Sequence, residues 1–436
     1  MTKGSRMTSF TIDTSTWTEQ QFGDCDLGDQ RRTKRLVQLA AQAANDPASS
    51  LPQQTESWGD AKAAYRLLSN PDVTFAAITA PHHRQTRQVP AGRYLVLGDT
   101  TEIDFGVQRG IAGLGPTGNG GGSGFLLHSA LVVSAANAEI LGLAGQTIYY
   151  RSARPKQENT TQRLKRPRES QVWGTVIDQV GPPPAGVDWV HVLDRGADNF
   201  EVFVHLLEQR AEWVVRSAQL QRKIQTPAGK TMQLCKYLAS LSVAGTYELS
   251  LRARPQQALR VAKLQVKVGK VQVPTPVHRS EYVKSSGRTT IAMWVVEVCE
   301  VDAPWNCEPI RWVLYTSLPV ETFNDAWQVI GYYEQRWLIE EWHKALKTGC
   351  RVAERQLKSK QGLEALTGLL SVVAVRLLQL KSAARSQPNR PALELIPSRW
   401  IAMLSAARKQ SVASRTLTVR EFYRPGQARR LLGSQV

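Results

Sequence analysis

Cysteine is scarce in this chain, and the cysteines present form no recognisable pattern. The 436 residues include five cysteines, which are scattered and never spaced as a C-x-x-C pair. An odd and scattered set disfavours both a disulfide framework and a zinc site. The seven histidines include no H-E-x-x-H motif. Because His82 and His83 are adjacent, their rings point apart on a helix or a strand, and we expect both to be surface residues.

Long hydrophobic runs are also missing. No segment approaches the roughly 18 consecutive apolar residues that a membrane span requires, and residues 1–10 lack the apolar core of a signal peptide. We therefore expect a soluble, cytoplasmic protein with no membrane partner.

Acidic residues are outnumbered by basic ones. The chain has 37 Asp and Glu against 55 Lys and Arg, which gives a net charge of +18 and a pI near 9.9. Such an excess of positive charge usually indicates that the protein binds a polyanion. The length favours two or three structural units.

Residues 15–90 have helical periodicity, with a break at residues 46–50. A basic cluster, which we expect on the turn before an apolar helical stripe, consists of Arg31, Arg32, Lys34 and Arg35. A solvated helix face and a phosphate contact explain this cluster about equally well.

From residue 93 the pattern changes to strands. The apolar runs 94–97 and 189–193 read as buried strands, and they end at Asp99 and Asp194. Further strands are expected at 125–133, 140–150 and 213–215, and helices at 168–180 and 200–209. This mixture predicts an α/β architecture around one sheet.

Residues 220–318 consist of alternating and β-branched runs, which predict an inserted, mostly β unit. Helical periodicity returns over residues 321–385. The glycine-rich stretch 113–122 matches G-x-G-x-x-G, but it opens no helix, so we interpret it as a flexible loop rather than a dinucleotide site.

Residues 333–347 predict one helix with two different faces. Its polar face carries Tyr333, Arg336, Glu340, Lys344 and Lys347. Leu338, Ile339 and Trp342 fall on the opposite, apolar face. A solvated face with i,i+4 ion pairs and a metal-binding carboxylate flanked by phosphate-binding cations both fit this pattern.

The spacing of Tyr333, Arg336, Glu340 and Lys347 resembles the Y-R-E-K signature of the insertion-sequence-four family of bacterial DDE transposases. Other segments of the chain resemble the same family, and the similarity extends over roughly residues 18–423. These segments are Asp99-Thr100-Thr101, Leu193 to Asp198, Val214 to Ser217, Asp26 to Arg32 and Ala64-Tyr65-Arg66.

The resemblance implies a ribonuclease-H-like mixed-sheet catalytic core in which Asp99, Asp194 and Glu340 bind two Mg²⁺ ions, with Mn²⁺ as a substitute. Glu341 is the alternative third ligand, and Glu102, Asp104 and Asp198 are other acidic residues nearby in sequence. The residues implied to grip the DNA backbone are Arg216, Tyr333, Arg336, Lys344 and Lys347. For Trp312, stacking on a flipped base during hairpin formation competes with a place in the core.

The implied activity is cut-and-paste transposition in the bacterial cytoplasm, at the nucleoid. The implied partners are double-stranded DNA with terminal inverted repeats, target DNA and a second protomer in a paired-end complex. We expect a helical DNA-binding domain at 15–90, a catalytic domain at 91–385 and a short helical C-terminal segment at 386–436. That segment lacks the family's long pairing region, so we expect weak dimerisation, and a truncated, non-catalytic DNA-binding relic or transposition inhibitor is the alternative.

Overall fold

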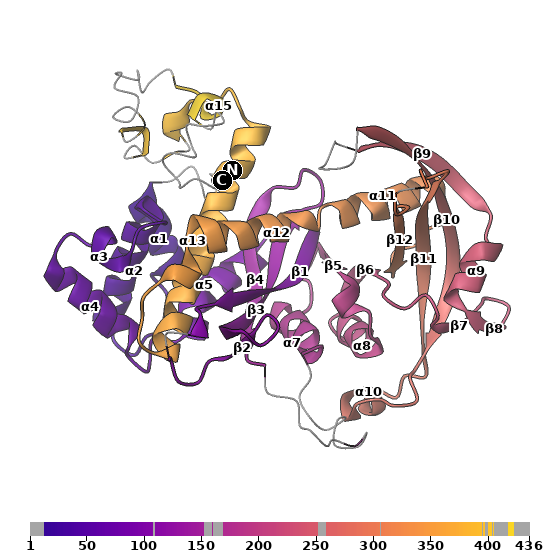
Figure 1. Ribbon diagram of the computed structural model, residues 1–436, viewed down its shortest axis with the longest axis horizontal. Coiled ribbons are helices and arrows are strands. Elements are labelled where there is room, and N and C mark those ends of the chain that lie inside the picture. Colours follow the sequence, from indigo (N-terminus) through magenta and orange to yellow (C-terminus); the bar gives the residue numbers. More distant parts are fainter. Residues whose placement is uncertain are drawn as a thin grey trace.

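A computed structural model describes residues 13–107, 110–151, 159, 169–251, 259–305, 307–394, 396, 400–402, 404 and 417–422. Figure 1 shows the N-terminal helices at one end of an elongated molecule and the strands β9 to β12 at the other. One sheet of parallel and antiparallel strands joins the two ends, and helices pack on it. The architecture is therefore α/β, as the sequence predicts.

The N-terminal region is helical, as expected. Its helices are α1 (Thr14–Phe22), α2 (Gln30–Asn45), α3 (Leu51–Gln54), α4 (Trp58–Leu68) and α5 (Phe75–Arg87). Asp13, Asp29, Ser57 and Thr74 cap α1, α2, α4 and α5, because each side chain accepts a hydrogen bond from a backbone N–H of the first turn. The predicted break falls between α2 and α3.

Twelve strands form the sheet in the described part of the chain. Their bounds are β1 (Gly92–Asp104), β2 (Gly115–Thr117), β3 (Gly122–Ser134), β4 (Ile140–Tyr149), β5 (Val187–Leu193), β6 (Glu212–Arg216), β7 (Lys223–Gln225), β8 (Thr231–Gln233), β9 (Val243–Leu251), β10 (Arg260–Pro274), β11 (Thr290–Val301) and β12 (Arg311–Thr316). In the central part, β3 is antiparallel to its two neighbours β4 and β1, whereas β5 runs parallel to both β1 and β6.

Helices cover both faces of this central part. On one face lie α7 (Gln171–Val180) and α8 (Phe200–Glu208), which pack with Tyr94 and Val96 of β1. On the other lie α12 (Trp337–Lys344) and α13 (Lys360–Ser386), which pack with Leu95 and Leu97. Because successive strand residues alternate between the two cores, residues 94–97 read as one continuous apolar run.

Residues 220–318 form β7 to β12 together with the short helices α9 (Leu234–Ser240) and α10 (Glu281–Ser285). The sheet continues from the central part into this region, because β12 pairs antiparallel with β6. Helix α11 (Phe323–Glu334) then leads back along the sheet toward α12 (Figure 1).

Helix α13 is the one helix in the described ranges that is long and apolar enough to cross a membrane, and 89% of its apolar window is buried inside the protein. It packs against α2, α4, α5 and β4, which is the position of a core helix. Beyond α13, the described elements are a 3₁₀ turn (Ala392–Glu394) and α15 (Val419–Phe422). Most of the predicted 386–436 segment lies outside the described residues.

Two predictions about residues 82–83 and 113–122 are wrong. His82 and His83 are buried, because α5 lies between α1, β4 and α13; His82 bonds Gln21 and accepts from the Leu143 N–H at 3.0 Å. The glycine-rich stretch is ordered by pairing, because β2 forms an antiparallel hairpin with β3 through a turn at residues 118–121.

Candidate active site and DNA-binding surface

Asp99 and Asp194 are placed by the pairing of two parallel strands. Gly98 of β1 lies opposite Leu193 of β5, so the residues that follow them, Asp99 and Asp194, come at equivalent positions. Asp194 directly follows β5, but the predicted strand end at Asp99 is wrong, because β1 continues to Asp104 through its pairing with β3. Backbone N–H groups fix one oxygen of each carboxylate. Asp99 Oδ1 accepts from Thr100 N at 2.8 Å, and Asp194 Oδ1 accepts from Gly196 N at 2.7 Å.

Helix α12 brings the third carboxylate, Glu340, to the same region. Leu338, Ile339 and Trp342 are buried whereas Glu340 and Lys344 are exposed, so the predicted two-faced pattern is confirmed for this helix. The predicted single helix is nevertheless interrupted. Tyr333 lies in the last turn of α11, and Lys347 lies in a π-helical turn (Ala345–Gly349) after α12. π-Helical turns are frequent at functional sites.

Arg336 connects strand β1, which carries Asp99, with helix α12, which carries Glu340. Its Nη1 lies 3.3 Å from Asp99 Oδ2, and its Nη2 forms an ion pair with Glu340 Oε1. The arginine therefore bridges a carboxylate of the sheet and a carboxylate of the helix.

The pKa of Asp99 is raised to about 6. Burial is the largest cause, and the negative charges of Asp194 and Glu340 add to it, while the Thr100 N–H and Arg336 act in the opposite direction. A carboxylate that is buried beside two others is stabilised by a cation. The electrostatics of the site thus favour positive charge near Asp99.

Three carboxylates supply the hard oxygen ligands that Mg²⁺ prefers. Within the residues that the structure describes, no three His, Cys, Asp or Glu side chains are already gathered around one point. The donor types thus fit a magnesium site, but Asp99, Asp194 and Glu340 must converge to form it, and Arg336 lies between two of them.

The other acidic residues have partners of their own. Glu341 pairs with Lys381 of α13, and the buried Asp198 pairs with Arg222 at 2.5 Å. Asp104 accepts from Gly106 N and Ser123 N, and Glu102 binds Arg151. These contacts give each of the four a structural role in the described chain.

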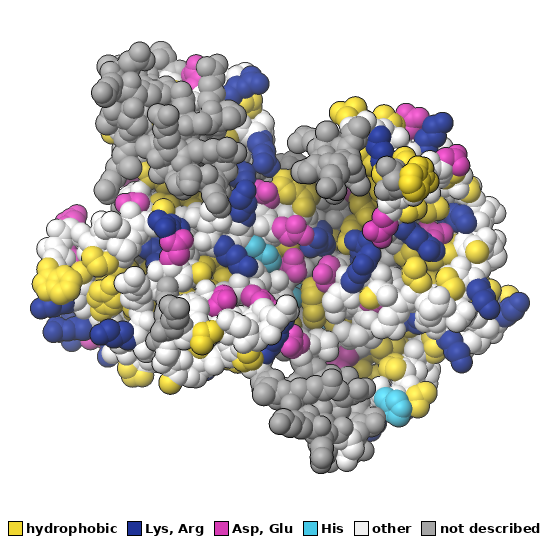
Figure 2. All heavy atoms as spheres, viewed as in Figure 1, with side chains coloured by type: hydrophobic (Ala, Val, Ile, Leu, Met, Phe, Trp, Pro, Cys, Tyr) yellow, Lys and Arg dark blue, Asp and Glu magenta, His cyan; other side chains and the backbone are white. Residues whose placement is uncertain are grey.

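Other residues that we predicted to bind DNA differ in exposure. Lys344 and Lys347 are exposed, whereas Tyr333 is buried and its ring packs edge-on against half-buried Trp312 with 5.6 Å between centroids. Arg216 ends β6 and donates to the Arg311 carbonyl at 3.3 Å. On the face of the molecule that Figure 2 shows, acidic side chains lie near the middle, with lysine and arginine side chains on either side of them.

One residue near the site was not singled out from the sequence. His343, one turn after Glu340, is buried, and its Nε2 has no hydrogen-bond partner among the described atoms. Its pKa is lowered to about 3, first by burial and then by the charge of Lys347. The spacing E-x-x-H, which puts the two side chains one turn apart on a helix, was the available signal.

The basic cluster lies within α2 rather than on a turn, and it divides into two pairs. Arg32 and Arg35 are tied to other parts of the helical region, through Asp72 at 2.5 Å and Asp60 at 3.0 Å. Arg31 is exposed and forms an ion pair with the cap Asp29, and Lys34 is also exposed. Only this second pair points outward.

Helix α4 presents an exposed stripe that the sequence did not reveal. Trp58, Lys62 and Arg66 recur at every fourth position and are all exposed. Trp58 is 66% exposed, and the Lys62 ammonium lies 5.5 Å from its ring centroid. Figure 2 shows lysine and arginine side chains gathered at this end of the molecule.

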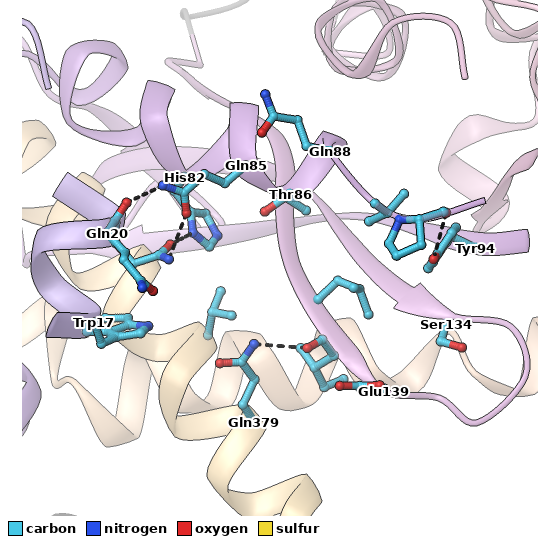
Figure 3. A pocket seen from close by; sticks show the side chains of 16 residues that line it. Trp17, Gln20, His82, Gln85, Thr86, Gln88, Tyr94, Ser134, Glu139 and Gln379 are labelled. Carbon is cyan, nitrogen blue, oxygen red and sulfur yellow. Dashed lines mark hydrogen bonds between the residues drawn. The ribbon is translucent and has the colours of Figure 1, made fainter. Parts of the chain in front are cut away.

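A cavity of about 610 Å³ lies between α1, α5, β1 and α13 (Figure 3). Its polar lining is rich in glutamine, including Gln20, Gln85 and Gln379, and Glu139 is the charged residue among those that line it. Because no Lys or Arg is among the described residues that line this cavity, their side chains do not suit a phosphate, and none of the three carboxylates Asp99, Asp194 and Glu340 is among them.

The helical region that carries the outward-facing cations also has a counterpart among known proteins. Residues 14–73, which comprise α1 to α4, match the family model described as transposase DNA-binding, and this match supports a transposase that has DNA as a partner.

Proposed function

We propose that this protein is a DDE transposase that cuts and joins DNA with two Mg²⁺ ions held by Asp99, Asp194 and Glu340. The observation that carries the proposal is the strand register, which places Asp99 within β1 and Asp194 directly after β5 at equivalent positions of neighbouring parallel strands, together with the Arg336 bridge from Asp99 to Glu340. The DNA-binding match of residues 14–73 supplies the substrate class.

The order of the central strands supports the same reading. β4, β3, β1, β5 and β6 are adjacent in that order, with three antiparallel strands followed by two parallel ones. This is the arrangement expected of a ribonuclease-H-like core. The Y-R-E-K spacing favours the insertion-sequence-four family, and within it the transposon-five type of enzyme. On this proposal, β7 to β12 are an insertion in the catalytic domain.

The site residues have separate tasks in this proposal. When bound, two Mg²⁺ ions would activate a water molecule or a 3′ hydroxyl group and stabilise the leaving oxygen of a phosphodiester, and Mn²⁺ would substitute. The N–H groups of Thr100 and Gly196 orient the two aspartates. Arg336, Lys344 and Lys347 neutralise phosphates of the strand that is cut, and Arg216 and Tyr333 assist them.

DNA recognition belongs to the N-terminal helices in this proposal, with terminal inverted repeats as the specific ligand and target DNA bound later. Trp312 would stack on a flipped base during hairpin formation. Since its ring already packs on Tyr333, the base would stack on a part of the indole that Tyr333 leaves open. Paired-end complexes would contain two protomers.

The test compares substitutions that remove a charge and keep the shape. Asp99→Asn, Asp194→Asn and Glu340→Gln should each abolish Mg²⁺-dependent cleavage of duplex DNA and leave DNA affinity nearly unchanged, because affinity comes from the cations. Glu341→Gln is the matched control, because this neighbour of Glu340 pairs with Lys381. Cleavage that survives Glu340→Gln but not Glu341→Gln would refute the assignment. DNA binding with no cleavage by the unaltered protein would favour the non-catalytic alternative.

A further inference from the structure

The guanidinium group of Arg336 occupies oxygens that the proposed function needs. It donates to Asp99 Oδ2 at 3.3 Å and to Glu340 Oε1. The side chains of Arg336 and Asp99 are each 18% exposed, so solvent screens their contact only partly. One internal cation therefore holds the sheet carboxylate and the helix carboxylate together.

The remaining oxygen of Asp99 is already engaged by the Thr100 N–H. Oδ2 is therefore the Asp99 oxygen that accepts no hydrogen bond from the adjacent backbone, and it is the one that Arg336 holds. A guanidinium group and Mg²⁺ both require negatively charged oxygens, so they compete for Asp99 Oδ2 and Glu340 Oε1.

We propose that Arg336 is an internal counter-ion that keeps the carboxylates from metal ions until DNA binds, an inference that rests on the proposed function. A DNA phosphate is negatively charged, as the carboxylates are, and it can accept two hydrogen bonds from the planar guanidinium group. It can therefore replace the carboxylates as the partner of Arg336. When Arg336 turns to the phosphate, Asp99 and Glu340 are released. Metal binding and DNA binding are then coupled, and each raises the affinity for the other by the same factor.

The coupling is measured without any cleavage. Mn²⁺ is titrated into the DNA-free protein, and the free ion is followed by electron paramagnetic resonance. Arg336→Gln should raise the Mn²⁺ affinity about tenfold, within the usual range of coupling between sites. A mixed-sequence duplex of about 40 base pairs at low salt should raise the Mn²⁺ affinity of the unaltered protein and leave that of Arg336→Gln nearly unchanged.

Two variants test whether a higher Mn²⁺ affinity comes from release of the carboxylates or only from the loss of a positive charge. Lys344→Gln removes the same charge at the other end of α12, which Arg336 directly precedes, and no ion pair joins Lys344 to Asp99 or Glu340 in the described chain. Arg336→Lys keeps the charge but cannot span two carboxylates, so it should also raise the Mn²⁺ affinity, and it guards against misfolding of the neutral variant. Equal effects of Lys344→Gln and Arg336→Gln would overturn the inference.

Failure of this inference differs from failure of the proposed function. If Asp99→Asn and Glu340→Gln leave DNA-dependent Mn²⁺ binding intact, the proposed metal site is wrong. If they abolish it while Arg336→Gln leaves the DNA-free affinity unchanged or lower, the metal site stands and Arg336 is not its counter-ion.

Discussion

Arg35 of α2 is bonded to Asp60 of α4 at two places: its Nη1 lies 3.0 Å from Asp60 Oδ1, and its Nη2 donates to the Asp60 carbonyl at 2.7 Å. Asp60 lies in the first turn of α4, three residues after the cap Ser57. This contact fixes the start of α4, and with it the exposed stripe that begins at Trp58, relative to α2.

We expect Arg35→Ala to destabilise the N-terminal helices by about 1–3 kcal/mol, because hydrogen bonds to a charged group are lost and Asp60 loses its partner. Chemical denaturation of the whole protein, followed by helical circular dichroism, measures this change. Lys34→Ala, one residue away and exposed, should change stability by less than about 0.5 kcal/mol. A large loss with Lys34→Ala and none with Arg35→Ala would contradict the assigned roles.

Arg31 and Lys34 should contribute to the salt dependence of DNA binding. Each phosphate contact adds about 0.9 to the slope of log affinity against log salt, so neutralising both residues should lower the slope by about two units. Fluorescence anisotropy at several salt concentrations gives the slope. An unchanged slope would show that the two side chains face solvent in the complex.

Trp58 should contribute to DNA affinity through its ring rather than through charge. Its large exposed surface lies in the segment that matches the transposase DNA-binding model. We expect Trp58→Ala to weaken duplex binding about tenfold with no change in the salt slope, since no phosphate contact is lost. The matched control is Trp305→Ala, because Trp305 is 98% exposed and lies between β11 and β12, outside the matched segment. Equal losses for the two variants would rule out a specific role for Trp58.

Asp99 should make the stability of the metal-free protein depend on pH. Its folded pKa, about 6, lies above the ordinary value of 3.8 mainly because of burial. The folded state therefore binds the proton more tightly, so this contribution is fully present below about pH 4 and is lost as pH rises through about 6.

Asp99→Asn should remove this dependence and raise stability at pH 7 by at most about 3 kcal/mol, at about 1.4 kcal/mol per pKa unit. Urea denaturation at pH 4, 5, 6 and 7 without metal compares the two proteins. If both curves keep the same slope between pH 4 and 6, Asp99 does not titrate as described.

The local pattern of the chain determined the main strands and helices around the site and the apolar faces of β1, β5 and α12. The apolar runs before Asp99 and Asp194 predicted two buried strands, and the helical spacing around Glu340 predicted which residues of α12 are buried. These features follow from strand and helix periodicity, which is a property of neighbouring residues. The roles of the residues carried over by family resemblance remain predictions.

Contacts between distant segments were decided by the tertiary structure. His82 and His83 are buried because α13, almost 300 positions later in the chain, closes over α5. Arg32 and Arg35 differ from Arg31 and Lys34 because Asp72 and Asp60 come close when the helices pack. Arg336 meets Asp99 across 237 positions. Such partners depend on packing and strand register, which no local spacing encodes, because an ion pair needs two groups within a few ångströms in space.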